Sequence, residues 1–302
     1  MSNLKFITAS FVTLVIFLAS CSKDQMESNA EATITNEYST SILLTKMANL
    51  NDSLIKTRPT TRGVFERGCI IAGDISGAVG LARAGLWAGG LLGPQTAIGV
   101  GFIGGLIGAV SGSYVAYCAT YHTRGIGDTN ATLKPMDVIA AYASTLDDKV
   151  DIEQHKPKII DVDYPIQDED ISLMGARHNV ILQNLLENKF NYRAVENYFT
   201  EQELEFLNSK VYTQAYDSIM SQIEVSGGLS VTGDDLASKL VNLFNQLVAQ
   251  YPQAEDDMEY IINKYIEAVK ASSEVSDEDK KIIYQALSVA ASSYEYWNNQ
   301  LK

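Results

Sequence analysis

Residues 90–112 read GLLGPQTAIGVGFIGGLIGAVSG, a stretch that combines many glycines with enough apolar residues to be buried. It belongs to a segment, residues 63–127, that holds 17 of the 21 glycines of the chain. No residue between Arg83 and His122 carries a formal charge. Because glycine costs a helix about 1 kcal/mol relative to alanine, the thirteen glycines between Gly73 and Gly112 require a compensating contact.

The spacing of these glycines predicts two packed helices. Residues four apart share a helix face, and the glycines form rows at this spacing. Each row is a groove without side chains, where another backbone can approach closely. Pro94 is a natural helix stop in the middle of the segment. The sequence therefore predicts a glycine-zipper helical hairpin folded at Pro94, with eight packing residues: Gly85, Gly89, Gly93, Gly101, Gly104, Gly105, Gly108 and Gly112.

Two cysteines flank this hairpin almost symmetrically. Cys69 lies 25 residues before Pro94, and Cys118 lies 24 residues after it. Folding at Pro94 brings both thiols to the same end of the hairpin, so the pair is a candidate disulfide. In the chain-entropy model such a bond would stabilise the fold by about 4 kcal/mol.

The N-terminal residues are typical of a secretory signal peptide. MSNLKFITASFVTLVIFLASCSKD contains one lysine, then an apolar run at residues 6–19, then small residues before a cysteine. The run is shorter than the roughly 20 residues of a membrane span. Residues 18–21, Leu-Ala-Ser-Cys, resemble the lipobox of bacterial lipoproteins. The resemblance implies that Cys21 is acylated and becomes the new N-terminus; the alternative is an ordinary signal peptide with an incidental cysteine.

The charge of the chain restricts its partners. Removal of residues 1–20 takes away Lys5 and no acid, which changes the net charge from −14 to −15. Such a surface repels nucleic acid and anionic lipid headgroups. Residues 22–24, Ser-Lys-Asp, loosely resemble the acidic tags that send some Gram-negative lipoproteins to the outer surface. We therefore expect a cell-envelope location at the outer membrane, membrane contact through the N-terminal lipid, and no nucleic-acid partner.

Composition divides the chain into five segments. After Gly127 the sequence is acidic and helix-forming, without a sustained strand alternation. We expect an all-α fold in which the hairpin is followed by a helical bundle. The segments are a signal peptide (1–20), a tether (21–33), an amphipathic helix and linker (34–62), the hairpin (63–127) and an all-α C-terminal domain (130–302).

The sequence contains no recognisable catalytic or cofactor motif. GVGFIG at residues 99–104 matches GxGxxG as a string, but it lacks the preceding strand that a dinucleotide site needs. His122, His155 and His178 lie in separate segments, so no metal site is expected. His178 and Asn179 lie beside an apolar helical stripe, where a hydrogen-bonded core histidine explains them better than catalysis does. We expect no enzymatic activity and no cofactor.

Two resemblances concern residues 70–121 only. The lipobox followed by a hairpin with small residues four apart resembles the glycine-zipper lipoproteins of Gram-negative envelopes. GDISGAVGLARAGLWAGG, residues 73–90, is similar to the glycine-rich segment of some secreted bacteriocin peptides. The first resemblance implies an envelope lipoprotein. We expect it to be non-enzymatic, with a hairpin that inserts into the bilayer or self-associates through its side-chain-free grooves and with acidic helices that present a surface to an unidentified protein. The second implies a membrane-perturbing toxin. A third alternative is a hairpin buried under the C-terminal helices.

Overall fold

The chain folds into an all-α structure, as the composition predicts. A computed structural model describes residues 41–57, 60–89, 94–121, 133–231, 233–252 and 254–301. Within these ranges every regular element is helical, and no strand occurs. The tether and Cys21 lie outside the described residues.

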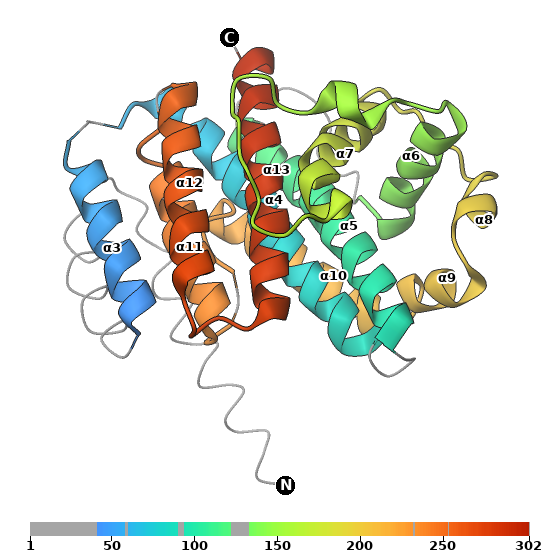
Figure 1. Ribbon diagram of the computed structural model, residues 1–302. Helices are drawn as coiled ribbons and strands as arrows, with labels where there is room; N and C mark the ends of the chain where they lie inside the picture. The colour runs from blue at the N-terminus through green and yellow to red at the C-terminus, as the bar shows by residue number, and fades with distance from the viewer. Residues whose placement is uncertain are drawn as a thin grey trace, which may run out of the picture.

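The helices are labelled as in Figure 1. Their bounds are α3 Ile42–Ile55, α4 Arg62–Gly89, α5 Pro94–Tyr121, α6 Pro135–Asp147, the 3-10 helix η2 Ile152–His155, α7 Glu169–Leu186, α8 Val195–Tyr198, α9 Glu201–Leu207, α10 Lys210–Ser226, α11 Leu236–Val248, α12 Glu255–Ala271 and α13 Asp277–Gln300.

Polar caps begin several of these helices where the sequence predicts them. The Thr200 hydroxyl accepts a hydrogen bond from the amide of Glu203, whose carboxylate accepts one in return from the amide of Thr200. The Ser276 hydroxyl caps α13 by accepting a hydrogen bond from the amide of Asp279. A further cap follows soon after Thr200, because the Ser209 hydroxyl accepts from the amide of Tyr212 and begins a new helix. The chain therefore bends between α9 and α10.

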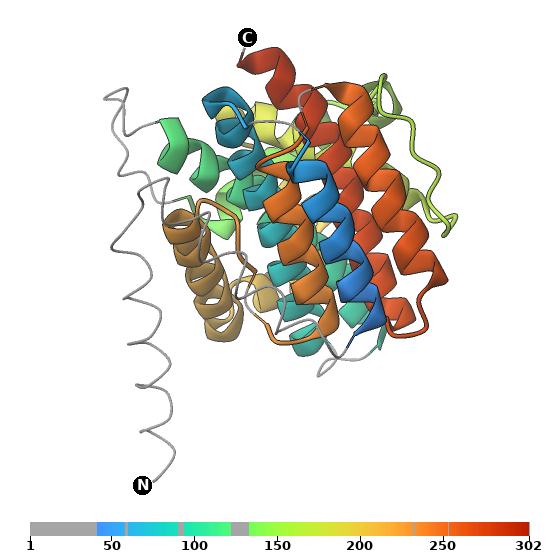
Figure 2. The same ribbon diagram turned by 90° about the vertical axis from the view of Figure 1, so that its left-hand side faces the viewer.

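The hairpin α4–α5 lies at the centre of the molecule. Figure 1 shows it passing obliquely between α3, α11, α12 and α13 on one side and α6, α7, α8 and α9 on the other. Figure 2, turned by 90°, shows α3, α11 and α12 as a layer in front of it. One face of α4 packs into a core with α3, α11, α12 and α13, and its other face packs into a core with α5, α6, α7 and α10.

Both cores therefore draw on the hairpin and on the helices after residue 130. The compositional boundaries near residues 62 and 130 do not divide the described residues into separately packed cores. The amphipathic helix α3 also belongs to this body, since Asn51 donates a hydrogen bond to the carbonyl of Leu243 at 2.7 Å and accepts one from Tyr265 at 3.0 Å.

The two arms of the hairpin run in opposite directions and make the most extensive contact between any two helices. A side chain on Gly77 or Gly108 would overlap the carbonyl oxygen of the other residue. A Cβ at Gly104 would lie 2.6 Å from the carbonyl oxygen of Leu81, and a Cβ at Gly85 would lie 2.6 Å from that of Val100. Backbone thus meets backbone at each of these glycines.

The other predicted packing glycines lie as follows. Gly101 faces the side chain of Leu86, Gly105 faces Ala82 and Met174, and Gly112 faces the carbonyl of Gly73. Gly89 is the last residue of α4, and Gly93 lies outside the described residues. The structure thus places six of the eight residues against a neighbouring helix, four of them solely against the opposite arm, whereas Gly105 also meets α7 and Gly112 also meets α10.

Replacement of Gly108 by alanine should separate the two arms. The new methyl group meets the backbone of Gly77, which cannot rotate away as a side chain could, so we expect a loss of at least about 2 kcal/mol in the free energy of unfolding. Urea unfolding of the full mature chain measures this change.

Gly63 provides the matched control for this substitution. It lies in the first turn of α4, and a Cβ there meets nothing within 4 Å. Gly63→Ala should stabilise the chain by up to about 1 kcal/mol through helix propensity. Equal effects of the two substitutions would show that the close approach of α4 and α5 does not stabilise the fold.

Candidate functional site

A polar cluster lies between the hairpin and its covering helices. It contains Asp74 of α4, Ser113 of α5, His178 of α7 and Ser293 of α13, and each of the four residues is fully buried. Because buried polar groups carry a desolvation cost, this cluster is the first place to look for chemistry.

Hydrogen bonds connect most of the cluster. Ser293 donates to Asp74 Oδ2, and the indole of Trp297 donates to the hydroxyl of Ser113 at 3.2 Å. His178 Nδ1 lies 2.9 Å from the amide oxygen of Asn179. This contact assigns the proton to Nδ1, because an amide oxygen can only accept. His178 Nε2 is then an acceptor.

Two atoms of the cluster have no partner among the described residues. They are Asp74 Oδ1 and His178 Nε2. His178 Nε2 lies 3.9 Å from Asp74 Oδ2, which is too long for a hydrogen bond. The two side chains therefore face each other without a direct bond.

Burial shifts the protonation of both groups. It raises the pKa of Asp74 well above its ordinary value, and the hydrogen bonds from Ser293 and Ser113 offset only part of the rise. It lowers the pKa of His178 to about 4, despite the opposing contact with Asn179. Both shifts favour the uncharged form of the side chain.

This arrangement does not form a hydrolytic triad. In a triad, histidine lies between the serine and the acid and takes the serine proton. Here Ser293 bonds to the acid directly, and the histidine that would act as base is protonated only near pH 4. All four side chains are also shielded from solvent. The cluster joins helices and does not present a nucleophile.

Arg83 makes a second polar link between the hairpin and its cover. Its guanidinium contacts Asp235 at 2.7 Å and Asp279 at 2.9 Å. Asp235 caps α11, and Asp279 lies in the first turn of α13. Burial acts to raise the pKa of Asp235, but the hydrogen bonds from Arg83 and Ser238 outweigh it and lower the pKa to about 2. One arginine thus holds the beginnings of two helices.

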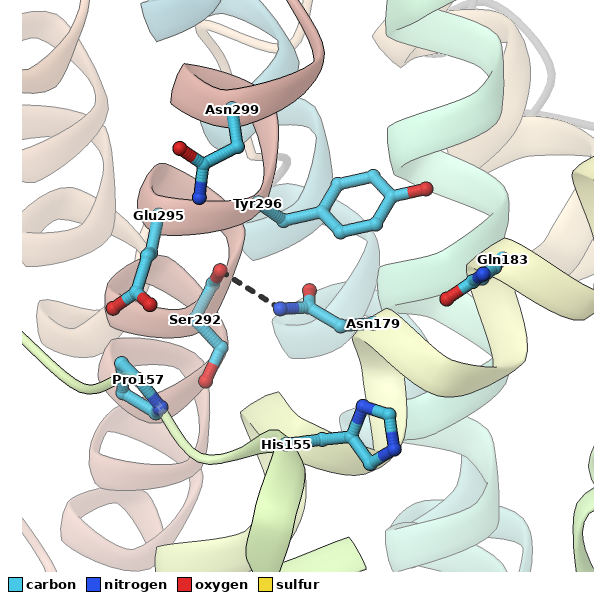
Figure 3. Close-up of a pocket in the computed structure, with 8 residues that line it drawn as sticks. All are labelled: His155, Pro157, Asn179, Gln183, Ser292, Glu295, Tyr296 and Asn299. Carbon is cyan, nitrogen blue, oxygen red and sulfur yellow. Dashed lines mark hydrogen bonds between the residues drawn. The ribbon is translucent and has the colours of Figure 1, made fainter. Parts of the chain in front are cut away.

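A pocket opens at the surface beside Asn179 and Ser292, the chain neighbours of His178 and Ser293 (Figure 3). Its volume is about 150 Å³, and it lies between α7, α13 and the residues around η2. Asn179 forms part of the wall and donates a hydrogen bond to the carbonyl of Ser292 at 2.8 Å. The lining residues are His155, Pro157, Asn179, Gln183, Ser292, Glu295, Tyr296 and Asn299.

The predicted disulfide is absent, because Cys69 and Cys118 are both free thiols. The thiols lie at the same end of the hairpin, but they face different surroundings. Cys69 is buried next to Gly227 at the end of α10, and burial raises its pKa to about 12. Cys118 is half-buried and interacts with Tyr114 one turn before it in α5. Because Cys69 and Cys118 are almost equally far from Pro94 along the chain, they lie at the same end of the hairpin, but their side chains do not face each other.

Sequence analysis identified only part of this site. It singled out His178 and Asn179. Ser293, which bonds Asp74, is separated from it by 219 positions, so no local pattern connects the two. The sequence of α13 does indicate a close contact with another helix, because the small residues Ser288 and Ser292 lie four apart. In the structure they pack against Gly175 of α7.

The paired shifts of Asp74 and His178 predict an unusual pH dependence. Between about pH 4 and 6.5, the unfolded chain holds one proton on His178 and none on Asp74, whose ordinary pKa is 3.8. In the folded chain the pKa of Asp74 is raised and that of His178 is lowered, so unfolding favours release of a proton from Asp74 and uptake of one by His178. Because these two changes oppose each other, the pair contributes less slope than either group would alone.

Asp74→Asn should reveal the pH dependence that His178 alone gives to the free energy of unfolding. The folded pKa of His178 is lowered, so its contribution is lost as pH falls, and the free energy of unfolding should drop by about 1.4 kcal/mol per pH unit between pH 6.5 and 4.5. His178→Gln should expose the opposite slope, because the raised pKa of Asp74 makes stability fall as pH rises above about 4. Urea unfolding of each variant and the parent at pH 4.5, 5.5, 6.5 and 7.5 gives the differences. Parallel profiles for Asp74→Asn and the parent would contradict this assignment.

Comparison with known proteins adds no function to this geometry. No protein-family model matches the chain, and no similar curated protein or solved structure was found. The function is therefore inferred from the residues themselves. They form a buried polar cluster and a polar pocket at the surface.

Proposed function

We propose that the chain is a lipid-anchored, non-enzymatic lipoprotein of the cell envelope whose acidic helical body binds a protein partner. The observation that carries this proposal is the lipobox, Leu18-Ala19-Ser20-Cys21, at the end of a short apolar run. Cys21 holds the chain on the membrane, and the polar residues after it separate the body from the lipid surface. The outer membrane of a Gram-negative cell is the compartment that the residues after Cys21 favour.

The hairpin serves in this proposal as the core of the body. Arg62–Leu86 and Val100–Thr120 are long and apolar enough to cross a membrane, but 78% and 67% of their most apolar windows are buried in the structure. Core helices of water-soluble proteins often have this composition. Length and hydropathy alone therefore do not decide between a core and a membrane role.

Polar contacts of the hairpin favour the core role. Ser76 donates to the carbonyl of Gly228 at 2.7 Å, and Ser111 bonds to Tyr216 at 3.2 Å. With the contacts of Asp74, Ser113 and Arg83, these bonds give polar groups on both arms a partner on a covering helix. A bilayer would offer none of these partners.

The glycine rows are also unavailable for self-association. In the described part of the hairpin they face the opposite arm, or in places the covering helices. A homo-oligomer through these rows would require the hairpin to open. We therefore place the partner-binding surface on the outer face of the acidic body, where a basic protein surface is complementary to its net charge.

Cys21→Ala should abolish lipid attachment. When cells are labelled with palmitate, the parent chain should incorporate the label and sediment with membranes. The variant should incorporate none and leave the membrane fraction. Cys118→Ser is the matched control and should retain both label and membrane association. Labelling that persists in Cys21→Ala would overturn the proposal.

The buried hairpin also predicts that the mature chain leaves bilayers intact. Liposomes of mixed zwitterionic and anionic lipid, loaded with a self-quenched dye, should release no more dye with the unlipidated mature chain than with buffer. Gly108→Ala, in which the arms should separate, tests whether a loosened hairpin changes this result. Release of dye by the parent chain would instead favour the membrane-perturbing toxin.

A further inference from the structure

We propose that the pocket between α7 and α13 binds the guanidinium group of an arginine side chain on the protein partner. This inference rests on the proposed function, since it specifies how the acidic body recognises that partner. The pocket is open at the surface, and residues from three distant parts of the chain converge on it (Figure 3).

The size of the pocket suits one side chain. Its volume of about 150 Å³ is below the 300–1,000 Å³ of typical small-molecule and cofactor pockets. A single water needs only about 10–15 Å³ by this kind of measure, so the pocket has room for several water molecules. An arginine head with its last methylene groups is of this order, whereas a nucleotide or haem is too large.

The parallel direction of α7 and α13 places partial negative charge at the pocket. Three contacts between them, Asp168 with Lys281, Gly175 with Ser288 and Asn179 with Ser292, each join residues 113 positions apart. The helices therefore run parallel, and both carboxyl ends lie on the side of the pocket. Helix carboxyl ends carry partial negative charge and favour cations.

Glu295 supplies a full negative charge in a fixed position. Its Oε2 atom accepts hydrogen bonds from the amides of Lys158 at 2.7 Å and Ile159 at 3.3 Å. These contacts hold the carboxylate at the pocket wall, and Glu295 is the only acidic residue among the lining residues. The only basic lining residue is the exposed His155, and the neighbouring Lys156 pairs with Glu153 at 2.8 Å.

Tyr296 supplies an aromatic wall. Its ring packs edge-on against the buried Trp297, with ring centroids 5.2 Å apart, so the ring is held in place. A guanidinium can lie flat on such a ring. Figure 3 shows the Glu295 carboxylate on the other side of α13, so it attracts the cation through its charge and not in the same contact. Figure 3 shows Tyr296 extending from α13 toward Gln183 of α7, across the upper side of the pocket.

Chemical-shift titration of the full mature chain, made lipid-free by Cys21→Ala, tests the proposal. The probe is N-acetyl-arginine-N-methylamide, and N-acetyl-citrulline-N-methylamide is its neutral control of the same shape. The arginine probe should shift the side-chain amide signals of Asn179 and Gln183 and the indole signal of Trp297 in a saturable way. The citrulline probe should bind at least about tenfold more weakly.

Glu295→Gln should weaken arginine binding by about tenfold. The new amide oxygen can still accept from the amides of Lys158 and Ile159, so the fold should be kept. Glu224→Gln, at an exposed position of α10 far from the pocket, is the matched control and should bind as the parent does. Equal binding of the two probes, an unchanged affinity in Glu295→Gln, or no shift at the pocket would each overturn the proposal.

The arginine titration and the palmitate labelling can fail independently of each other. Palmitate labelling at Cys21 with no arginine binding would leave the lipoprotein proposal standing and remove the pocket. Arginine binding without labelling would do the reverse.

Discussion

The structure depends on the close approach of two backbones at Gly77 and Gly108. At this point neither arm of the hairpin has room for a side chain. The surrounding helices pack around the closely spaced pair of α4 and α5. Glycine weakens an isolated helix, so neither arm is expected to be stable alone. Their mutual contact and the cover of six other helices offset that cost, and the helical state of α4 and α5 is therefore a property of the whole body.

The polar residues of the hairpin explain how such an apolar pair keeps one orientation. Leucine and isoleucine pack in many ways with similar energies, whereas Asp74, Ser76 and Arg83 each require a partner at one place. Asp74 meets α13, Ser76 meets the end of α10, and Arg83 meets the beginnings of α11 and α13. A rotation of α4 about its axis would leave these groups buried and unpaired. They therefore fix the rotation of the hairpin inside its cover.

Much of this architecture follows from local patterns in the sequence. The glycine spacing predicts which faces of the two arms meet, and caps such as Thr200 and Ser276 predict where helices begin. Local patterns are less informative where two signals lie close together, as at Thr200 and Ser209, each of which caps a helix of its own. They carry no information on contacts between distant segments. Two such contacts are the hydrogen bond between Asp74 and Ser293 and the one between Asn179 and Ser292 at the pocket wall. Both form only when α13 has packed beside α4 and α7. Spacing likewise placed Cys69 and Cys118 at one level but could not give the direction of each thiol.

The position of α13 has a consequence for the order of folding. This helix is the last along the chain, and it completes both cores and both polar links of the hairpin. During synthesis or export, α4 and α5 emerge about 150 residues before it. Two long apolar helices therefore remain partly uncovered until the final segment arrives. A chain of this design folds slowly relative to its synthesis, because its decisive contacts span most of its length. In the interval the apolar surface of these two helices is open to contact with neighbouring chains.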